Sequence, residues 1–298
     1  MSEHAHVLVP VDSSSHSLAG LVYALVSFPK ATVTALHVFD PTDPSSLGLD
    51  DTAPVSEDES GRHPGDRVLE RATETATEYG REIQTALVRG TPHREIVEYV
   101  YDHDVDHVVM GSHGSSPVAR PFLGHVSEAV VRRVPVSTTI VPESRTQLLQ
   151  RDFPGRILVP VDGSEQSRAA LEYAVDHFPD ARITVFHAVE TPFGDDGKPV
   201  GGELIERLVD TLSNRGTAIL EEAVAAVDSD AVVESALGHG SPANAILDHA
   251  IENEFDQILM GSHGRSIPAR IVLGSVAETV ARRSTLPVTL VRGSRPHR

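Results

Sequence analysis

The feature that most constrains this chain is an internal repeat with a period of 150 residues. The longest matching segments are Val9-Pro10-Val11-Asp12 with Val159-Pro160-Val161-Asp162, and Met110-Gly111-Ser112-His113-Gly114 with Met260-Gly261-Ser262-His263-Gly264. Shorter matches, such as Leu123-Gly124 with Leu273-Gly274, keep the same offset. A fixed offset along the whole chain indicates one domain written twice. We therefore predict a first domain over residues 1–145 and a second over residues 154–298.

Each copy alternates strand and helix signals. In the first copy, short apolar or β-branched runs predict strands at 6–11, 32–39, 83–88, 107–110 and 138–141, and helices are predicted at 15–28, 67–79, 92–102 and 126–134. Short apolar strands between amphipathic helices are typical of a parallel sheet with right-handed crossovers. The predicted fold class is α/β, with helices on both faces of each sheet.

A glycine pattern after the fourth predicted strand of the second copy points to an anion site. Gly261, Gly264 and Gly274 are separated by two and nine residues, and Ser275 follows. Glycine lets a ligand approach the backbone closely, and the N-terminus of the next helix offers free N–H donors to a phosphate. Ser275-Val276-Ala277-Glu278 also reads as a capping box, in which Ser275 would only satisfy the helix end.

These segments together resemble the universal stress protein family. The strand ending in Val-Pro-Val-Asp, the Met-Gly-Ser-His-Gly run and the spaced glycines followed by Ser are all similar to its ATP-binding pattern, over both copies. The resemblance implies two tandem Rossmann-like (flavodoxin-like) sheets of five parallel strands in the order 3-2-1-4-5. It also implies a bound adenine nucleotide, ATP or a relative, held in the second copy by Pro160, Val161, Asp162, Ala188, Met260, Gly261, Gly264, Gly274, Ser275 and Val276. Asp162 could alternatively help to hold Mg²⁺ or Mn²⁺ near the phosphates, or simply act as a helix N-cap.

The first copy departs from this pattern at one position. The glycine spacing is kept, but His125 stands where the pattern has Ser or Thr. By the resemblance, the matching residues of a weaker or silent site are Pro10, Val11, Asp12, Val38, Met110, Gly111, Gly114, Gly124, His125 and Val126. We expect His37 and His187, which end the second strand of each copy, to be partly buried and bonded to backbone.

The sequence lacks the motifs of several enzyme classes. Neither lysine, Lys30 nor Lys198, lies in a P-loop, and there is no Gly-x-Ser-x-Gly elbow. The adjacent Ser262 and His263 are not expected to pair as a hydrolase dyad. A metal site at residues 102–107, which contain two histidines and three aspartates, is weighed against a solvated acidic loop. The leading hypothesis is a stress-response module that binds a nucleotide without fast turnover; the alternatives are a slow metal-dependent ATPase or phosphotransferase and a ligand-free interaction protein.

Composition restricts the cellular location and the binding partners that can be expected. The chain has 298 residues, no cysteine, and 43 acidic against 25 basic residues, a net charge of −18. An acidic surface disfavours nucleic-acid binding and suits a high-salt cytoplasm, where salt screens self-repulsion. No apolar segment is long enough to span a membrane, so a cytoplasmic location is expected. The last strand of each copy would leave an open sheet edge, so we expect the two domains to pair within the chain, with homodimerisation as a further option.

Overall fold

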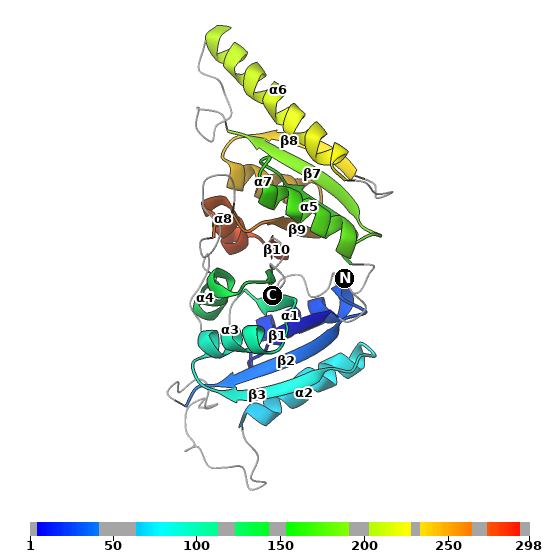
Figure 1. The fold of residues 1–298 in the computed structure, drawn as a ribbon, viewed down its shortest axis with the longest axis vertical. Helices are drawn as coiled ribbons and strands as arrows, with labels where there is room; N and C mark the ends of the chain where they lie inside the picture. The colour runs from blue at the N-terminus through cyan, green and yellow to red at the C-terminus, as the bar shows by residue number, and fades with distance from the viewer. Residues whose placement is uncertain are drawn as a thin grey trace. The chain divides into compact units, whose positions relative to one another are not determined.

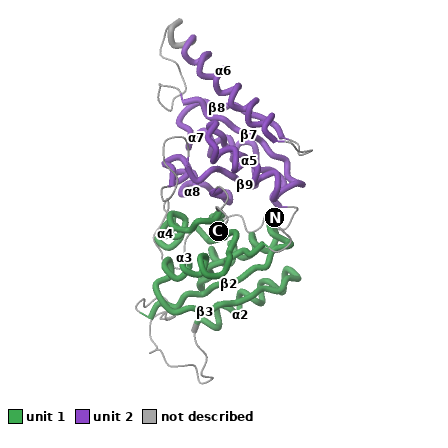
Figure 2. Tube along the Cα trace, viewed as in Figure 1, with its two compact units in different colours: residues 1–150 green, residues 151–298 purple. Residues whose placement is uncertain are grey.

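The computed structural model describes residues 5–41, 64–112, 123–142, 153–190, 203–227, 233–263 and 273–292. The chain divides into two compact units, residues 1–150 and 151–298 (Figure 2). Each unit is an α/β domain built around a parallel sheet, and each is described by itself. In the described part of the chain, no helix has the length and apolar character needed to cross a membrane.

Unit 1 alternates strands and helices along the chain (Figure 1). Its elements are β1 His6–Pro10, α1 Ser15–Ser27, β2 Thr32–Phe39, α2 Pro64–Glu78, β3 Gln84–Arg89, α3 Pro92–Asp102, β4 His107–Gly111, α4 His125–Arg133 and β5 Ser137–Val141. The strands are all parallel and lie in the order β3-β2-β1-β4-β5. The fold class and strand order expected from the resemblance are thus confirmed for this unit.

Unit 2 repeats the same topology. Its elements are β6 Arg156–Pro160, α5 Glu165–His177, β7 Arg182–Val189, α6 Glu203–Ala225, β8 Val233–His239, α7 Pro242–Glu252, β9 Gln257–Gly261, α8 Ser275–Arg283 and β10 Val288–Val291. The strand order is β8-β7-β6-β9-β10, again with every pair parallel. Helix α6, with 23 residues, is longer than α2, its counterpart of 15 residues.

The hydrophobic core of each unit lies on both faces of its central strands. Ile157, Leu158 and Val159 of β6 are fully buried, as are Val7, Leu8 and Val9 of β1. Side chains that alternate between the two faces can all be buried only where helices cover both faces. Since right-handed crossovers put α1 and α2 on one face and α3 and α4 on the other, continuous apolar strands are what this topology requires.

The strand order favours a site at the carboxyl ends of the central strands of each sheet. In unit 2 the chain moves outward from β6 through β7 to β8, then returns to β9 on the other side of β6. The loops after β6 and β9 therefore leave the sheet in opposite directions, and a crevice opens between them at the carboxyl ends of the strands. Open α/β sheets bind ligands at such switch points.

Candidate functional site

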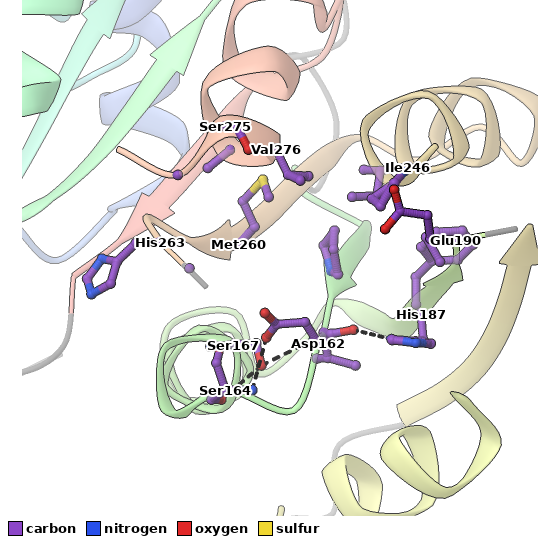
Figure 3. Close-up of a pocket in the computed structure, with 18 residues that line it drawn as sticks. Asp162, Ser164, Ser167, His187, Glu190, Ile246, Met260, His263, Ser275 and Val276 are labelled. Atoms are coloured by element: carbon purple, nitrogen blue, oxygen red, sulfur yellow. Dashed lines mark hydrogen bonds between the residues drawn. The ribbon is translucent and has the colours of Figure 1, made fainter. Parts of the chain in front are cut away.

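A cavity of about 400 Å³ lies at the carboxyl end of the sheet in unit 2 (Figure 3). It collects residues from the ends of three strands, β6, β7 and β9, and from the first turns of the helices α5, α7 and α8. Nine of the ten residues predicted for this copy line it: Pro160, Val161, Asp162, Ala188, Met260, Gly261, Gly274, Ser275 and Val276. The tenth, Gly264, lies outside the described residues. The glycine pattern and the strand-end pattern, about 100 residues apart in sequence, thus meet in one cavity.

The N-terminus of α8 faces this cavity with free backbone donors. Gly274 is the N-cap residue, with φ −65° and ψ 146°, and no side chain of the described residues caps the helix. The first N–H groups of a helix have no intrahelical partner, and the helix dipole makes them attractive to an anion. These are the N–H groups of Ser275, Val276 and Ala277, three residues that line the cavity.

The capping-box alternative for Ser275 is wrong. A capping box needs the serine at the N-cap position, whereas Ser275 is the first residue within the helix. The Oε1 atom of Glu278 lies 3.1 Å from the guanidinium of Arg282. Gly274 is held instead by its own N–H, which donates to the carbonyl of Ser262 at 2.9 Å.

The opposite wall of the cavity is the turn that leads from β6 into α5. Asp162 accepts a hydrogen bond from the N–H of Ser164 at 2.9 Å through its Oδ1 atom. Ser164 is the N-cap of α5, and its hydroxyl oxygen accepts the N–H of Ser167 at 3.2 Å. Asp162 therefore is not the N-cap itself; it stands two residues earlier and holds the turn that presents the cap.

A histidine of the second strand bonds to the residue that follows the first strand in both units. The Nδ1 atom of His187 lies 2.7 Å from the carbonyl oxygen of Val161, and His37 contacts Val11 in the same way at 2.8 Å. Because a carbonyl only accepts, Nδ1 carries the hydrogen in both rings. The expected bond to backbone is confirmed for both histidines; His187 is partly buried as expected, whereas His37 is buried. The bond ties the end of the first strand to the second.

Gly261 is required by helix packing. A Cβ atom there would lie 2.9 Å from both the carbonyl carbon and the carbonyl oxygen of Gln166, in the first turn of α5. Gly111 is tighter still, with the carbonyl carbon of His16 at 2.6 Å. The absence of a side chain at Gly261 thus allows the first turn of α5 to lie close to the end of β9.

A model of the universal stress protein family matches residues 4–142 and 154–292. The chain belongs to the universal stress protein family. It is 26% identical to a universal stress protein of Mycolicibacterium smegmatis over 294 residues, 96% of each chain. Universal stress protein YxiE of Bacillus subtilis matches 46% of this chain and 98% of its own length, at 34% identity. The crystal structure of a universal stress protein from Archaeoglobus fulgidus covers 97% of this chain and 98% of that one, with 25% identity and a TM-score of 0.66.

This universal stress protein also lines its cavity with residues that the sequence patterns did not identify. They are Ser164, Ser167, Phe186, His187, Glu190, Pro242, Ile246, His263 and Ala277. Phe186 and Ile246 are buried and make an apolar wall beside Ala188. The alternation of β7 would have marked Phe186 as a core residue, but only the docking of α7 against β7 brings Ile246 to the same wall.

Ser262 and His263 do pair, contrary to the expectation for adjacent residues. The serine Oγ lies 3.0 Å from Nδ1 of His263. Ser262 is only 1% exposed, so its hydroxyl is not available to attack a substrate. Burial, and then the charge of Arg292, lower the pKa of His263. Among the described residues, its buried Nε2 atom has no hydrogen-bond partner.

The first unit carries the corresponding residues on the same elements. Pro10, Val11 and Asp12 follow β1, Val38 lies in β2, Met110 and Gly111 end β4, and Gly124, His125 and Val126 begin α4. Gly114 lies outside the described residues. Gly124 is the N-cap of α4 without a side-chain cap, as Gly274 is for α8.

Two histidines distinguish the first unit at this place. His125 is exposed at the start of α4, and its ring faces that of His93 from α3, with centroids 6.1 Å apart and an angle of 72°. Burial lowers the pKa of His93, and the positive charges of Arg133, His125 and Arg94 lower it further. A lowered pKa favours the neutral form of the His93 ring beside His125.

The acidic run at residues 102–107 does not gather into a metal site. His107 points into the core, 2% exposed, with Nε2 2.8 Å from the hydroxyl of Thr139. The carboxylate of Asp106 accepts the N–H of His6 at 2.9 Å, and His103 stacks on Tyr99. Across the described residues, no group of three or more His, Asp or Glu side chains could hold a metal ion.

Proposed function

We propose that unit 2 of this universal stress protein binds an adenine nucleotide, ATP or a close relative. The observation that carries the proposal is that one cavity contains both the free N–H groups at the start of α8 and an apolar wall made by Ala188, Phe186 and Ile246. Phosphates suit the first feature and a flat base suits the second. A volume of about 400 Å³ falls within the usual range for small-molecule sites.

In this arrangement the phosphates would lie at the N-terminus of α8, near Ser275. The base would lie against Ala188, and the ribose between Asp162 and Met260. We extend the proposal to unit 1, where His125 would offer a ring N–H in place of the serine hydroxyl. A Mg²⁺ or Mn²⁺ ion brought by the nucleotide could contact Asp162, whose carboxylate is the oxygen ligand such ions prefer.

The first experiment is to denature the purified protein and analyse the nucleotide it releases. About one adenine nucleotide per chain supports a working site in unit 2, and about two supports a site in each unit. If none is released, calorimetric titration with ATP and ADP follows, and no heat of binding with either would contradict the proposal.

The variant Ser275→Glu separates the phosphate site from the stability of the helix. A carboxylate in the first turn of α8 is favourable for the helix dipole, so the melting temperature without ligand should stay the same or rise. The same carboxylate would occupy the place of the phosphate and would repel its negative charge. Saturating ADP should then no longer raise the melting temperature of unit 2, because a ligand stabilises only the state that it binds. His125→Glu is the matched variant in unit 1 and should leave the site in unit 2 unchanged.

We propose a regulatory rather than a catalytic role for the bound nucleotide. The Oδ1 atom of Asp162 already accepts a backbone N–H, and the hydroxyl of Ser262 is buried, which supports a site that holds the nucleotide over one that activates a nucleophile. Labelled ATP incubated with the protein for hours checks this. Steady hydrolysis that Asp162→Asn abolishes would favour the slow ATPase instead.

The setting and the assembly are part of the same proposal. We infer a cytoplasmic protein of a high-salt cell from the net charge of −18. The pairing of the two domains through their last strands, and any homodimer, stay predictions; sedimentation of the purified chain measures the second.

A further inference from the structure

Unit 1 carries a group of basic side chains where the helices α3 and α4 lie side by side (Figure 1). Its members are His93 and Arg94 in the first turn of α3, and His125 and Arg133 at the two ends of α4. The ring centroids of His93 and His125 are 6.1 Å apart. Burial lowers the pKa of His93, and the charges of Arg133, His125 and Arg94 lower it further, so all three lie near its ring. We call these four residues the basic cluster.

Unit 2 does not have this cluster. The residues at the corresponding positions, 150 residues later, are Ala243, Asn244, Ser275 and Arg283. Only Arg283 is basic, and its guanidinium donates a hydrogen bond to Oδ1 of Asn244 at 2.6 Å. In unit 1 the same two positions both hold arginine, so a second positive charge replaces the amide that accepts this bond. Three of the four positions are therefore basic in unit 1 alone.

No carboxylate of the described residues pairs with the two arginines of the cluster, Arg94 and Arg133. The acidic residues in the first turns of the two helices are engaged elsewhere. Glu128 of α4 pairs with Arg132 at 3.2 Å, and the carboxylate of Glu95 of α3 lies against the turn that follows β3. A basic cluster of this kind, in a chain with a net charge of −18, suits an anionic ligand.

The cluster adjoins the anion end of the site proposed for unit 1. His125 is the first residue of α4 and corresponds to Ser275, which lines the cavity of unit 2. Neither α3 nor α4 has a side-chain cap among the described residues, so the positive ends of two helix dipoles lie here as well. Arginine binds phosphate oxygens through parallel N–H groups, and a neutral imidazole still donates one N–H.

The extent of the cluster indicates more than one phosphate. Residues 125 and 133 are eight positions apart in a helix, which corresponds to a rise of about 12 Å. A single phosphate at the start of α4 cannot contact both ends of the cluster. A chain of phosphates that begins at His125 and continues along α3 brings its further charges toward Arg94 and Arg133.

We propose that the basic cluster of unit 1 binds a chain of two or more phosphates, carried by a nucleotide or by inorganic polyphosphate. For a nucleotide, the inference rests on the function proposed for unit 1; for the inorganic chain it does not. It predicts that unit 1 binds ATP more tightly than AMP because of the cluster.

Calorimetric titration of the full chain tests it. The parent protein carries Ser275→Glu, which closes the phosphate position of unit 2. The probes are inorganic tripolyphosphate, ATP and AMP. Tripolyphosphate and ATP should each bind at one site per chain and compete with each other. ATP should bind about tenfold more tightly than AMP, because its further phosphates gain hydrogen bonds to charged donors.

A double variant, His93→Ala with Arg94→Asn, gives unit 1 the residues of unit 2 at these positions. It should weaken the binding of tripolyphosphate and of ATP about tenfold, through the loss of charge-assisted hydrogen bonds, and leave AMP nearly unchanged. Arg71→Asn is the matched control, since it removes one positive charge from an exposed position on α2, on the other face of the sheet, and should change none of the three affinities. The melting temperatures of both variants should stay near that of the parent, as for most surface substitutions.

The failure of this inference and the failure of the proposed function are distinguishable. Equal affinities of the parent and the double variant for tripolyphosphate and ATP would overturn the role of the cluster and leave a nucleotide site without it. Absence of tripolyphosphate binding to the parent would also overturn it. If tripolyphosphate binds through the cluster but no nucleotide binds to the wild type, the proposed function fails, and the cluster stands as a site for inorganic polyphosphate.

Discussion

Replacing Gly261 by alanine tests whether the close approach of α5 to β9 forms the cavity. The new Cβ atom would lie 2.9 Å from the carbonyl carbon and oxygen of Gln166, closer than real Cβ contacts. These are backbone atoms in the first turn of a helix, so they cannot rotate away and the helix itself must shift. Overpacking of this kind costs about 1–3 kcal/mol. For a unit of this size, each kcal/mol lowers the melting temperature by about 2–4 °C, so we expect a loss of about 2–12 °C.

The shift of α5 should also weaken ligand binding. The first turn of α5 carries Ser164, which bonds to Asp162 in the cavity wall. Differential scanning calorimetry gives the stability, and titration with ADP gives the affinity of unit 2. Gly111→Ala is the matched control in unit 1, where the Cβ atom would lie 2.6 Å from the carbonyl carbon of His16. It should destabilise unit 1 at least as much and leave the affinity of unit 2 unchanged.

Two results would refute this reasoning. A Gly261→Ala protein that melts within about 1 °C of the wild type, well below the cost of overpacking, would mean that α5 can move freely. An equal loss of unit 2 affinity in Gly111→Ala would mean that the effect of Gly261→Ala on binding is not local.

Three further predictions concern stability. Ser127→Ala should destabilise unit 1 by about 1 kcal/mol, since the buried Ser127 hydroxyl donates to the carbonyl of Gly111 at 2.9 Å, whereas Ala277→Ser in unit 2 should be neutral or stabilising; urea unfolding of both variants checks this pair. Burial lowers the pKa of His249 below its ordinary 6.5, so the folded state binds fewer protons than the unfolded state and stability should fall as the pH drops below about 6.5. His249→Phe keeps a ring against Phe186, at 4.6 Å in the wild type, and its stability should fall less between pH 7 and pH 5 in the same assay. The melting temperature should drop below roughly 0.5 M salt because acidic self-repulsion is then less screened, and a flat profile from low to high salt would remove the high-salt interpretation.

The parts of the fold that could be predicted are those whose sequence patterns occur in both copies. The second strand, 32–39, and the helix at 92–102 agree with β2 and α3 residue for residue, because apolar periodicity and Pro92 mark them locally. The site could be predicted where strand ends and glycines carry a pattern. Ile246 could not, since it joins the cavity only through the packing of α7 against β7 and carries no local signal.

The capping of α8 could not be predicted from local residues either. The segment that begins at Ser275 has the composition of a capping box, but the N–H of Gly274 is anchored to Ser262 at the end of β9. This tertiary bond accompanies a helix that starts one residue earlier than the capping box requires, at Ser275 instead of Val276. Similarly, His107 belongs to an acidic run in sequence, but the pairing of β4 with β5 turns it toward Thr139 in the core.

The two copies differ at two further positions where the proposed ligand would lie. In unit 2, Ala188 and Ala277 line the cavity with single methyl groups. Unit 1 has Val38 and Ser127 at these places, and the hydroxyl of Ser127 already bonds to the end of β4. Each change adds side-chain volume to a close-packed region, where even one methylene group is felt. A duplicated domain under a single requirement to bind the same ligand twice would have kept the smaller residues in both copies. The added volume therefore argues that unit 1 binds the nucleotide more weakly than unit 2, and Val38→Ala with Ser127→Ala should bring the two affinities together.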